Sequence, residues 1–245
     1  TTIPSVQTYF AQKIANQFNE QYGTELQIEF AELNYLGNID LNNFLIKDHK
    51  NDTLIYFNSL YLSPSSLKKM MSNDFNFKSI AFDGLKLNIF KYLSEEKNNL
   101  EIFVDKLKLD KKNIDIESDI IFKINEIKGL DSSVEIKDYN IEDNNFSFYN
   151  LNLELTKINF NKSNIEFEIN NFEFKNSLGL NVNQFTSKLT YVDSNLSLKN
   201  LNLSYGNSNL EGDFLLDFSR IRNFSSLNTN VIDSVFLDFK IRNSN

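Results

Sequence analysis

A repeated β-strand pattern, which places apolar residues on one side of the chain, constrains this sequence more than any other feature. In SNIEFEINNFEF (Ser163–Phe174), isoleucine and phenylalanine alternate with polar residues up to Ile169. After the pair Asn170-Asn171 the alternation resumes one residue out of step, at Phe172. Both runs line one side of a sheet if the asparagines form either a two-residue hairpin or a bulge.

The same unit recurs along the second half of the chain. The segments LELTKINF, FEINNFEF and LSLKNLNL share the order apolar-x-apolar-x-x-apolar-x-apolar. This repeat is too degenerate for a named solenoid consensus, but it predicts a series of short strands from Leu100 onward. A similar phase shift predicts strand over Phe75–Tyr92. No linker rich in Pro, Gly or Ser divides the chain, so we expect a mostly β fold with one elongated, mostly antiparallel sheet.

Two short helices are predicted near the N-terminus. In Pro4–Tyr22, the apolar residues Val6, Phe10, Ile14 and Phe18 recur every four positions. The stripe is narrow, which favours a helix that covers one end of the sheet; a juxtamembrane helix lying at a bilayer surface is the alternative. The segment SPSSLKKMMSND predicts the second helix, with Ser63 as its cap and Pro64 in its first turn.

The predicted strands carry more apolar surface than two short helices can cover. The chain has 23 Phe and 10 Tyr but no Trp. An antiparallel sheet buries its apolar side against another layer or within itself, so a closed sandwich or barrel with a dry core is one solution. The other is a sheet curled into a trough that is apolar inside. Such a trough would attract acyl chains, since burying one CH₂ group contributes about 0.8 kcal/mol.

Composition and motifs argue against several other functions. The formal net charge of −8 disfavours nucleic acid as a partner. The chain has no Cys, and its only histidine, His49, lies in the predicted turn KDHKND. No metal-ligand spacing, phosphate-binding glycine loop or nucleophile elbow is present. We therefore expect neither catalysis nor a metal or cofactor. No stretch reaches the roughly 18 apolar residues that a membrane-spanning helix needs.

Four segments of the first hundred residues carry a resemblance to a known family. They are Ile3–Ile28, Gly37–Tyr56, Phe77–Tyr92 and Asn99–Leu107. In this order they resemble the N-terminal region of the TamB (translocation and assembly module) family. The cadence I-x-x-x-G-L-x-L at Ile80–Leu87 is shared with the wider AsmA-like group. The match covers residues 1–110 by motif, and residues 111–245 agree in strand pattern as a continuing repetitive β-groove.

The resemblance implies a fold, a location and a function. The sheet would form a U-shaped groove, the "β-taco", with helix Pro4–Tyr22 capping one end. The protein would be periplasmic and attached to the inner membrane through an anchor outside this chain. It would conduct phospholipids between the inner and outer membranes, and an outer-membrane barrel of the TamA type is the expected partner. The family supplies no catalytic residues, and His49 gains no role from it.

One set of residues is predicted to line the groove and contact phospholipid acyl chains. They are Leu151, Leu153, Leu155, Ile165, Phe167, Ile169, Phe172, Phe174, Leu196, Leu198, Leu201 and Leu203. One alternative is a chaperone or scaffold for outer-membrane protein assembly, in which exposed sheet edges pair with incoming strands. Another is an adhesin or carbohydrate-binding β domain with outward-facing aromatic residues. Most phenylalanines fall on the apolar side, which disfavours this last alternative.

Overall fold

The fold was analysed in a computed structural model of the chain. The structure describes residues 4–70, 76–108, 121–142, 145–161, 164–193, 195–217 and 236–244. Three helices are α1 (Pro4–Tyr22), α2 (Leu67–Met70) and α3 (Asn99–Lys108). The strands are β1 (Glu25–Leu33), β2 (Ile39–Lys47), β3 (Thr53–Pro64), β4 (Phe77–Asp83), β5 (Lys86–Lys91), β6 (Ile121–Asp138), β7 (Asn145–Asn161), β8 (Asn164–Asn176), β9 (Asn181–Val192), β10 (Asn195–Tyr205), β11 (Ser208–Asp217) and β12 (Phe236–Ser244).

All the strands belong to one twelve-stranded sheet, which confirms the mostly β prediction. Neighbours along the chain pair antiparallel, with one exception at β4 and β5. These two strands both pair antiparallel with β3 and parallel with β6. The predicted strand Phe75–Tyr92 is therefore two strands, although Phe75 lies outside the described residues. The sheet continues from β4 to β6 without interruption, across the expected boundary at residue 110.

The break between β4 and β5 lies at Gly84. Its φ is +62°, a left-handed conformation that glycine adopts without steric cost. A Cβ atom there would also overlap the side chain of Asn58 in β3. Glycine at position 84 therefore suits the break between the two strands, which continue in the same direction on either side of it.

The phase shifts in the sequence are β-bulges. Strand β8 runs unbroken through Asn170, and the pairing changes from Glu154–Asn171 to Leu155–Ile169, so a bulge is present and the hairpin alternative is wrong. The other two copies of the repeat behave alike. Register shifts interrupt β7 beyond Thr156 and β10 beyond Lys199.

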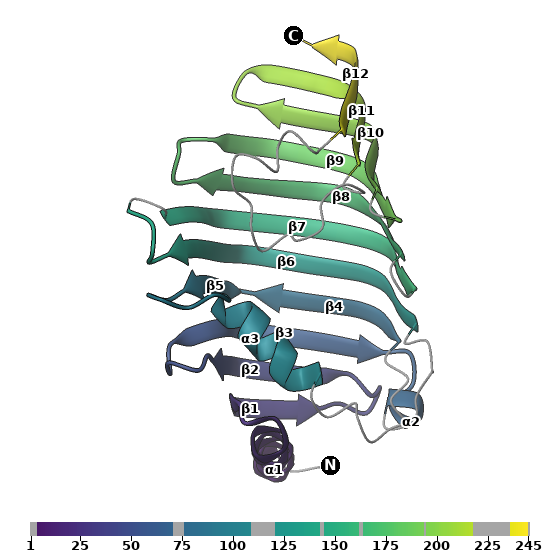
Figure 1. The fold of residues 1–245 in the computed structure, drawn as a ribbon. Coiled ribbons are helices and arrows are strands. Elements are labelled where there is room, and N and C mark those ends of the chain that lie inside the picture. Colours follow the sequence, from purple (N-terminus) through teal and green to yellow (C-terminus); the bar gives the residue numbers. More distant parts are fainter. Residues whose placement is uncertain are drawn as a thin grey trace.

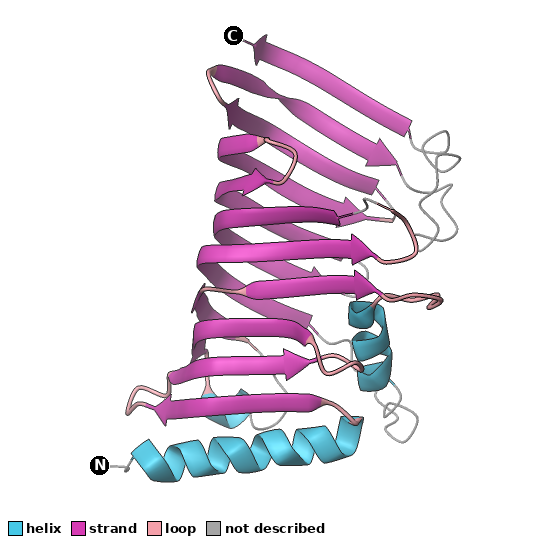
Figure 2. Ribbon diagram, turned by 90° about the vertical axis from the view of Figure 1, so that its left-hand side faces the viewer, coloured by secondary structure: helices cyan, strands magenta, loops and turns pink. Residues whose placement is uncertain are grey.

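Asparagine, aspartate and lysine occupy the left-handed positions at these irregular sites. Lys157 (φ +56°) and Asn200 (φ +52°) lie at bulges of the repeat, and Asp131 (φ +47°) and Asn150 (φ +52°) lie at register shifts where β6 pairs with β7. Bulges bend a strand and increase its local twist. The strands are accordingly curved along their length, and Figures 1 and 2 show the sheet as a bent stack rather than a flat layer.

Helix α1 has the predicted bounds and covers the edge of β1, below the sheet in Figure 2. The side chains of Gln7, Thr8 and Asn19 bond the backbone N–H and C=O groups of Leu33, Ala31 and Leu26, respectively. Ala15 is buried against the sheet. The side chains of Val6, Phe10 and Ile14, which belong to the predicted apolar stripe, lie outside the described part of the structure.

Two sequence predictions about helices are wrong. Ser63 and Pro64 belong to β3, and the four-residue helix α2 begins three residues later. The region from Leu100 was expected to be strand, but its first residues form α3. The cause is a capping box, in which Asn98 and Glu101 exchange hydrogen bonds between side chain and backbone N–H at 2.9 Å each.

Candidate functional site

One face of the sheet is apolar across neighbouring strands. Residues directly opposite each other in adjacent strands point to the same face. Leu153 of β7 lies opposite Gly129 of β6 and Phe172 of β8. The next row contains Leu155 and Ile169. Because the bulge at Asn170 absorbs the phase shift, both halves of β8 contribute to this face. We call it the apolar face.

The apolar face continues through the last strands. A row joins β8, β9, β10 and β11 through Ile165, Tyr191, Leu196 and Leu216. The parallel row next to it contains Phe167, Leu189, Leu198 and Phe214. The structure thus brings the predicted groove residues of β7, β8 and β10 together on a single face.

Aromatic rings connect the strands of this face. Phe174 lies 5.1 Å from Phe148 and 5.2 Å from Phe172, measured between ring centroids, and Phe172 lies 6.2 Å from Phe185. In the N-terminal strands, Phe57 is 5.8 Å from Phe44 and 5.4 Å from Phe82. These separations fall within the range of favourable ring contacts.

The apolar face is only partly buried. Of the predicted groove residues, Leu151, Ile169 and Leu201 are buried, with 6–9% of their surface exposed, and the others are half-buried. Among the described elements no second sheet packs on this one. The side chains are therefore neither sealed in a two-layer core nor fully exposed.

The opposite face is polar and carries ion pairs. Lys157 approaches Glu168 at 2.9 Å, Lys128 approaches Glu126 at 2.9 Å, and Lys188 pairs with Glu166. Such half-exposed pairs add little to stability but keep this face hydrated. The sheet is consequently amphipathic, with one polar, hydrated face and one apolar face.

Two serines on the apolar face do not interrupt its apolar character. Ser132 and Ser187 are buried, with 1% and 6% of their surface exposed. The hydroxyl of Ser132 donates to the Leu130 carbonyl, and that of Ser187 donates to the Lys199 carbonyl, both at 3.0 Å. Both carbonyls belong to bulges, and that of Leu130 also accepts from the Gly84 N–H at 3.0 Å. The hydroxyls thus bond to backbone acceptors within the sheet instead of remaining unsatisfied.

Sequence reasoning did not single out several residues of the apolar face. Phe185, Leu189 and Phe214 lie in the same rows as the predicted residues, and the Phe148 ring contacts that of Phe174. For Phe148, Phe185 and Leu189, the alternation in FSFYN and QFTSKLTY carried the signal. Only the pairing of strands β9 and β11 with their neighbours shows that these residues share the face.

His49 lies away from the apolar face, in the turn between β2 and β3. Its Nε2 is 3.0–3.1 Å from the Glu95 carboxylate, and its Nδ1 is buried without a hydrogen-bond partner among the described residues. Next to it, Asp48 accepts hydrogen bonds from the Tyr92 hydroxyl at 2.6 Å and the Asn99 amide at 2.9 Å. Burial alone would raise the pKa of Asp48, but these bonds and two backbone N–H groups lower it below its ordinary value.

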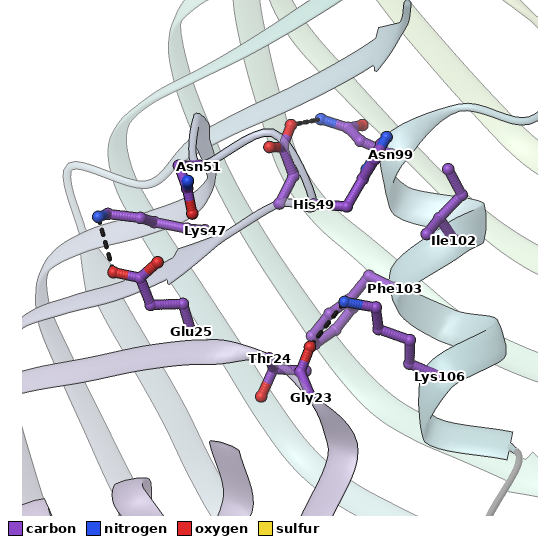
Figure 3. A pocket seen from close by; sticks show the side chains of 11 residues that line it. Gly23, Thr24, Glu25, Lys47, His49, Asn51, Asn99, Ile102, Phe103 and Lys106 are labelled. Atoms are coloured by element: carbon purple, nitrogen blue, oxygen red, sulfur yellow. Dashed lines mark hydrogen bonds and ion pairs between the residues drawn. The ribbon is translucent and has the colours of Figure 1, made fainter. Parts of the chain in front are cut away.

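This polar cluster anchors α3 beside the strand ends. Asn99 is 1% exposed, accepts from the Phe90 N–H at 2.8 Å and donates to the Asn88 carbonyl. At the other end of α3, the Lys106 ammonium donates to the Gly23 carbonyl at the end of α1, at 2.6 Å. Figure 3 shows the cavity of about 240 Å³ that these groups surround. It is largely polar and separate from the apolar face.

Searches for other kinds of site in the described residues found nothing. There, no three His, Cys, Asp or Glu side chains are placed to hold a metal ion. None of the described helices is long and apolar enough to cross a membrane. No protein-family model matches this chain, and no curated protein matches its sequence.

Proposed function

We propose that the apolar face is the floor and walls of a groove that holds phospholipid acyl chains. The observation that carries this proposal is a continuous apolar face without a second layer of sheet over it in the described structure. The resemblance to the TamB family supports the wider setting: a periplasmic segment of a protein anchored in the inner membrane, conducting lipid toward the outer membrane. No chemistry within this chain would drive the transfer.

The curvature of the strands supports a groove rather than a flat sheet. Bulges in β7, β8 and β10 bend these long strands, as the curved ribbons of Figure 2 illustrate. We infer that the bend turns the apolar face inward, so that the sheet encloses a U-shaped trough. An acyl chain in the trough would contact leucine, isoleucine and phenylalanine. Each buried CH₂ group would contribute about 0.8 kcal/mol, so two chains suffice without a specific contact to the head group.

Native mass spectrometry of the purified protein tests this function. We expect the wild-type protein to carry phospholipid. Phe167→Asp should reduce lipid occupancy by at least about tenfold, because a charge in the groove must be desolvated against hydrocarbon. Asn159→Asp is the matched control, since Asn159 is exposed and pairs with Lys123 and Glu166 on the polar face. Lipid-free wild-type protein, or equal loading of both variants, would contradict the proposal.

The alternative role as a scaffold for outer-membrane proteins requires a free sheet edge. The edge of β1 is already bonded by α1, so strand addition would have to use β12. A proline at Asp238, which pairs with Leu215 of β11, should weaken such addition while leaving lipid occupancy in β7–β10 intact. If the Asp238→Pro variant no longer supported the assembly of outer-membrane barrel proteins but still carried lipid, the scaffold role would be favoured.

A further inference from the structure

A second cavity lies on the opposite side of the sheet from the apolar face, where α1 meets β1–β3. Its volume is about 800 Å³. Gln27 of β1, Leu45 of β2 and Tyr56 of β3 occupy one cross-strand row, and all three line the cavity. Ile55 pairs with Ile46 and Leu87, so its neighbour Tyr56 points to the side of the sheet opposite these apolar residues. Leu26 and Ile28 of the edge strand β1 also line the cavity.

Polar side chains of α1 border the cavity on its helix side. Gln12 and Asn16, one turn apart on α1, both line the cavity, and Ala15 between them is the buried contact. Gln12 and Asn16 are exposed, as are Gln27, Glu29 and Asn43, so the cavity is open to solvent. The amides of Gln12 and Asn16 have no hydrogen-bond partner among the described residues. Each offers both donors and an acceptor to a ligand.

The floor of the cavity is a hydrogen-bonded relay. The Tyr56 hydroxyl donates to Asn43 Oδ1 at 2.6 Å, and Asn43 Nδ2 donates to Glu29 Oε2 at 2.6 Å. Asn43 has a φ of +50°, so the relay depends on a left-handed residue in mid-strand. The relay fixes the orientation of the Tyr56 ring and leaves acceptor capacity on Glu29.

From this geometry we propose that the cavity binds a neutral oligosaccharide. Uncommitted amides match vicinal hydroxyl groups, which also donate and accept. The Tyr56 ring, whose centroid is 5.7 Å from the Lys86 ammonium, offers a flat surface for the C–H face of a sugar. Glu29 is the only charged side chain that lines the cavity in the described structure, which disfavours an anion. The volume lies within the usual range of small-molecule sites and suits two or three sugar units.

Saturation-transfer NMR with cellotriose, maltotriose and chitotriose tests this proposal on the full chain. At least one trisaccharide should receive saturation from the wild-type protein. Tyr56→Ala and the double variant Gln12→Ala/Asn16→Ala should each weaken binding by about tenfold, the equivalent of one lost contact. The alanines favour helix, so α1 remains formed in the double variant.

The controls separate this site from unspecific contact and from the groove. Tyr35→Ala removes a tyrosine that is 95% exposed in the β1–β2 turn and does not line the cavity; its binding should be unchanged. Phospholipid occupancy of Tyr56→Ala should equal that of the wild type, because the two sites lie on opposite faces. Absence of transfer from all three sugars, or retained binding in Tyr56→Ala, would overturn the proposal.

Discussion

At the scale of single residues, close approach between strands depends on a missing side chain. Gly129 of β6 lies on the apolar face opposite Phe82 of β4 and Leu153 of β7. A Cβ atom at Gly129 would overlap the Phe82 ring, which covers this position. The ring thus replaces the side chain that glycine lacks, and the apolar face remains continuous across β4 and β6.

Gly129→Val should therefore destabilise the protein by overpacking. We expect a loss of about 1–3 kcal/mol in the free energy of unfolding, measured by urea denaturation. Adding Phe82→Ala should relieve the overlap, so the double variant should be more stable than the two single losses predict. Strict additivity of the two changes would show that the ring and residue 129 do not compete for the same space.

Asp48 predicts a pH dependence of stability. Burial raises the pKa of Asp48 in the folded state, but hydrogen bonds from Asn99, Tyr92 and two backbone N–H groups together outweigh burial and lower it. A depressed folded-state pKa means that the stabilisation is complete above the unfolded value of about 3.9. It is lost as the pH falls through the folded-state value. Asp48→Asn should reduce stability by about 2 kcal/mol at neutral pH.

Urea titrations of the wild type and Asp48→Asn at a series of pH values provide the measurement. The gap between the two proteins should narrow once the pH falls below about 4. The many other carboxylates titrate in both proteins, so the difference isolates Asp48. A gap that stays constant down to the lowest pH would assign the loss to packing rather than charge.

At the scale of the element, α1 acts as a substitute strand at the sheet edge. Gln7, Thr8 and Asn19 bond both backbone groups of their partners in β1, as a neighbouring strand would. Unpaired edges invite pairing with other chains. The three side chains therefore protect the edge through hydrogen bonds to its backbone groups.

The triple variant Gln7→Ala/Thr8→Ala/Asn19→Ala should expose this edge. Alanine keeps α1 helical, but the bonds to β1 are lost. We expect concentration-dependent self-association in sedimentation velocity experiments. The control variant Lys13→Ala/Glu20→Ala changes two exposed residues of α1. Its sedimentation behaviour should match that of the wild type. A triple variant that stays monomeric at every concentration would refute edge protection by these side chains.

The strands and their apolar faces could be predicted from the sequence, but not which strands pair or where the helices lie against the sheet. Period-two alternation is local, so the phase shift between Ile169 and Phe172 could be recognised from the sequence, whereas the choice of a bulge over a hairpin needed the strand pairing. Deleting one asparagine would restore strict alternation, so the extra residue serves the bend rather than the face. Helix α3 was missed because LEIFVDKLK also alternates as a strand would. The cavity at Tyr56 depends on where α1 lies, which no local pattern encodes.

At the scale of the whole molecule, the main contacts of the described strands are with their neighbours in the sheet, and α1 and α3 add contacts to β1 and β5. Without a shared core between distant strands, stability becomes a sum of nearest-neighbour terms, as in repeat proteins. The buried residues of the apolar face are spread in the same way: Ile46 lies in β2, Ile169 in β8 and Leu201 in β10. The two ends of the sheet should therefore unfold with considerable independence.

Hydrogen exchange measured by mass spectrometry tests this independence. Leu201→Ala should cost about 2 kcal/mol and accelerate exchange in β9–β11, while β1–β3 keep their protection. Ile46→Ala, its counterpart at the other end, should do the reverse. A closed sandwich or barrel would spread either loss over the whole chain, because all strands would share one core. Uniform acceleration in both variants would thus exclude a single-layered sheet, and with it the open apolar face on which the proposed lipid binding depends.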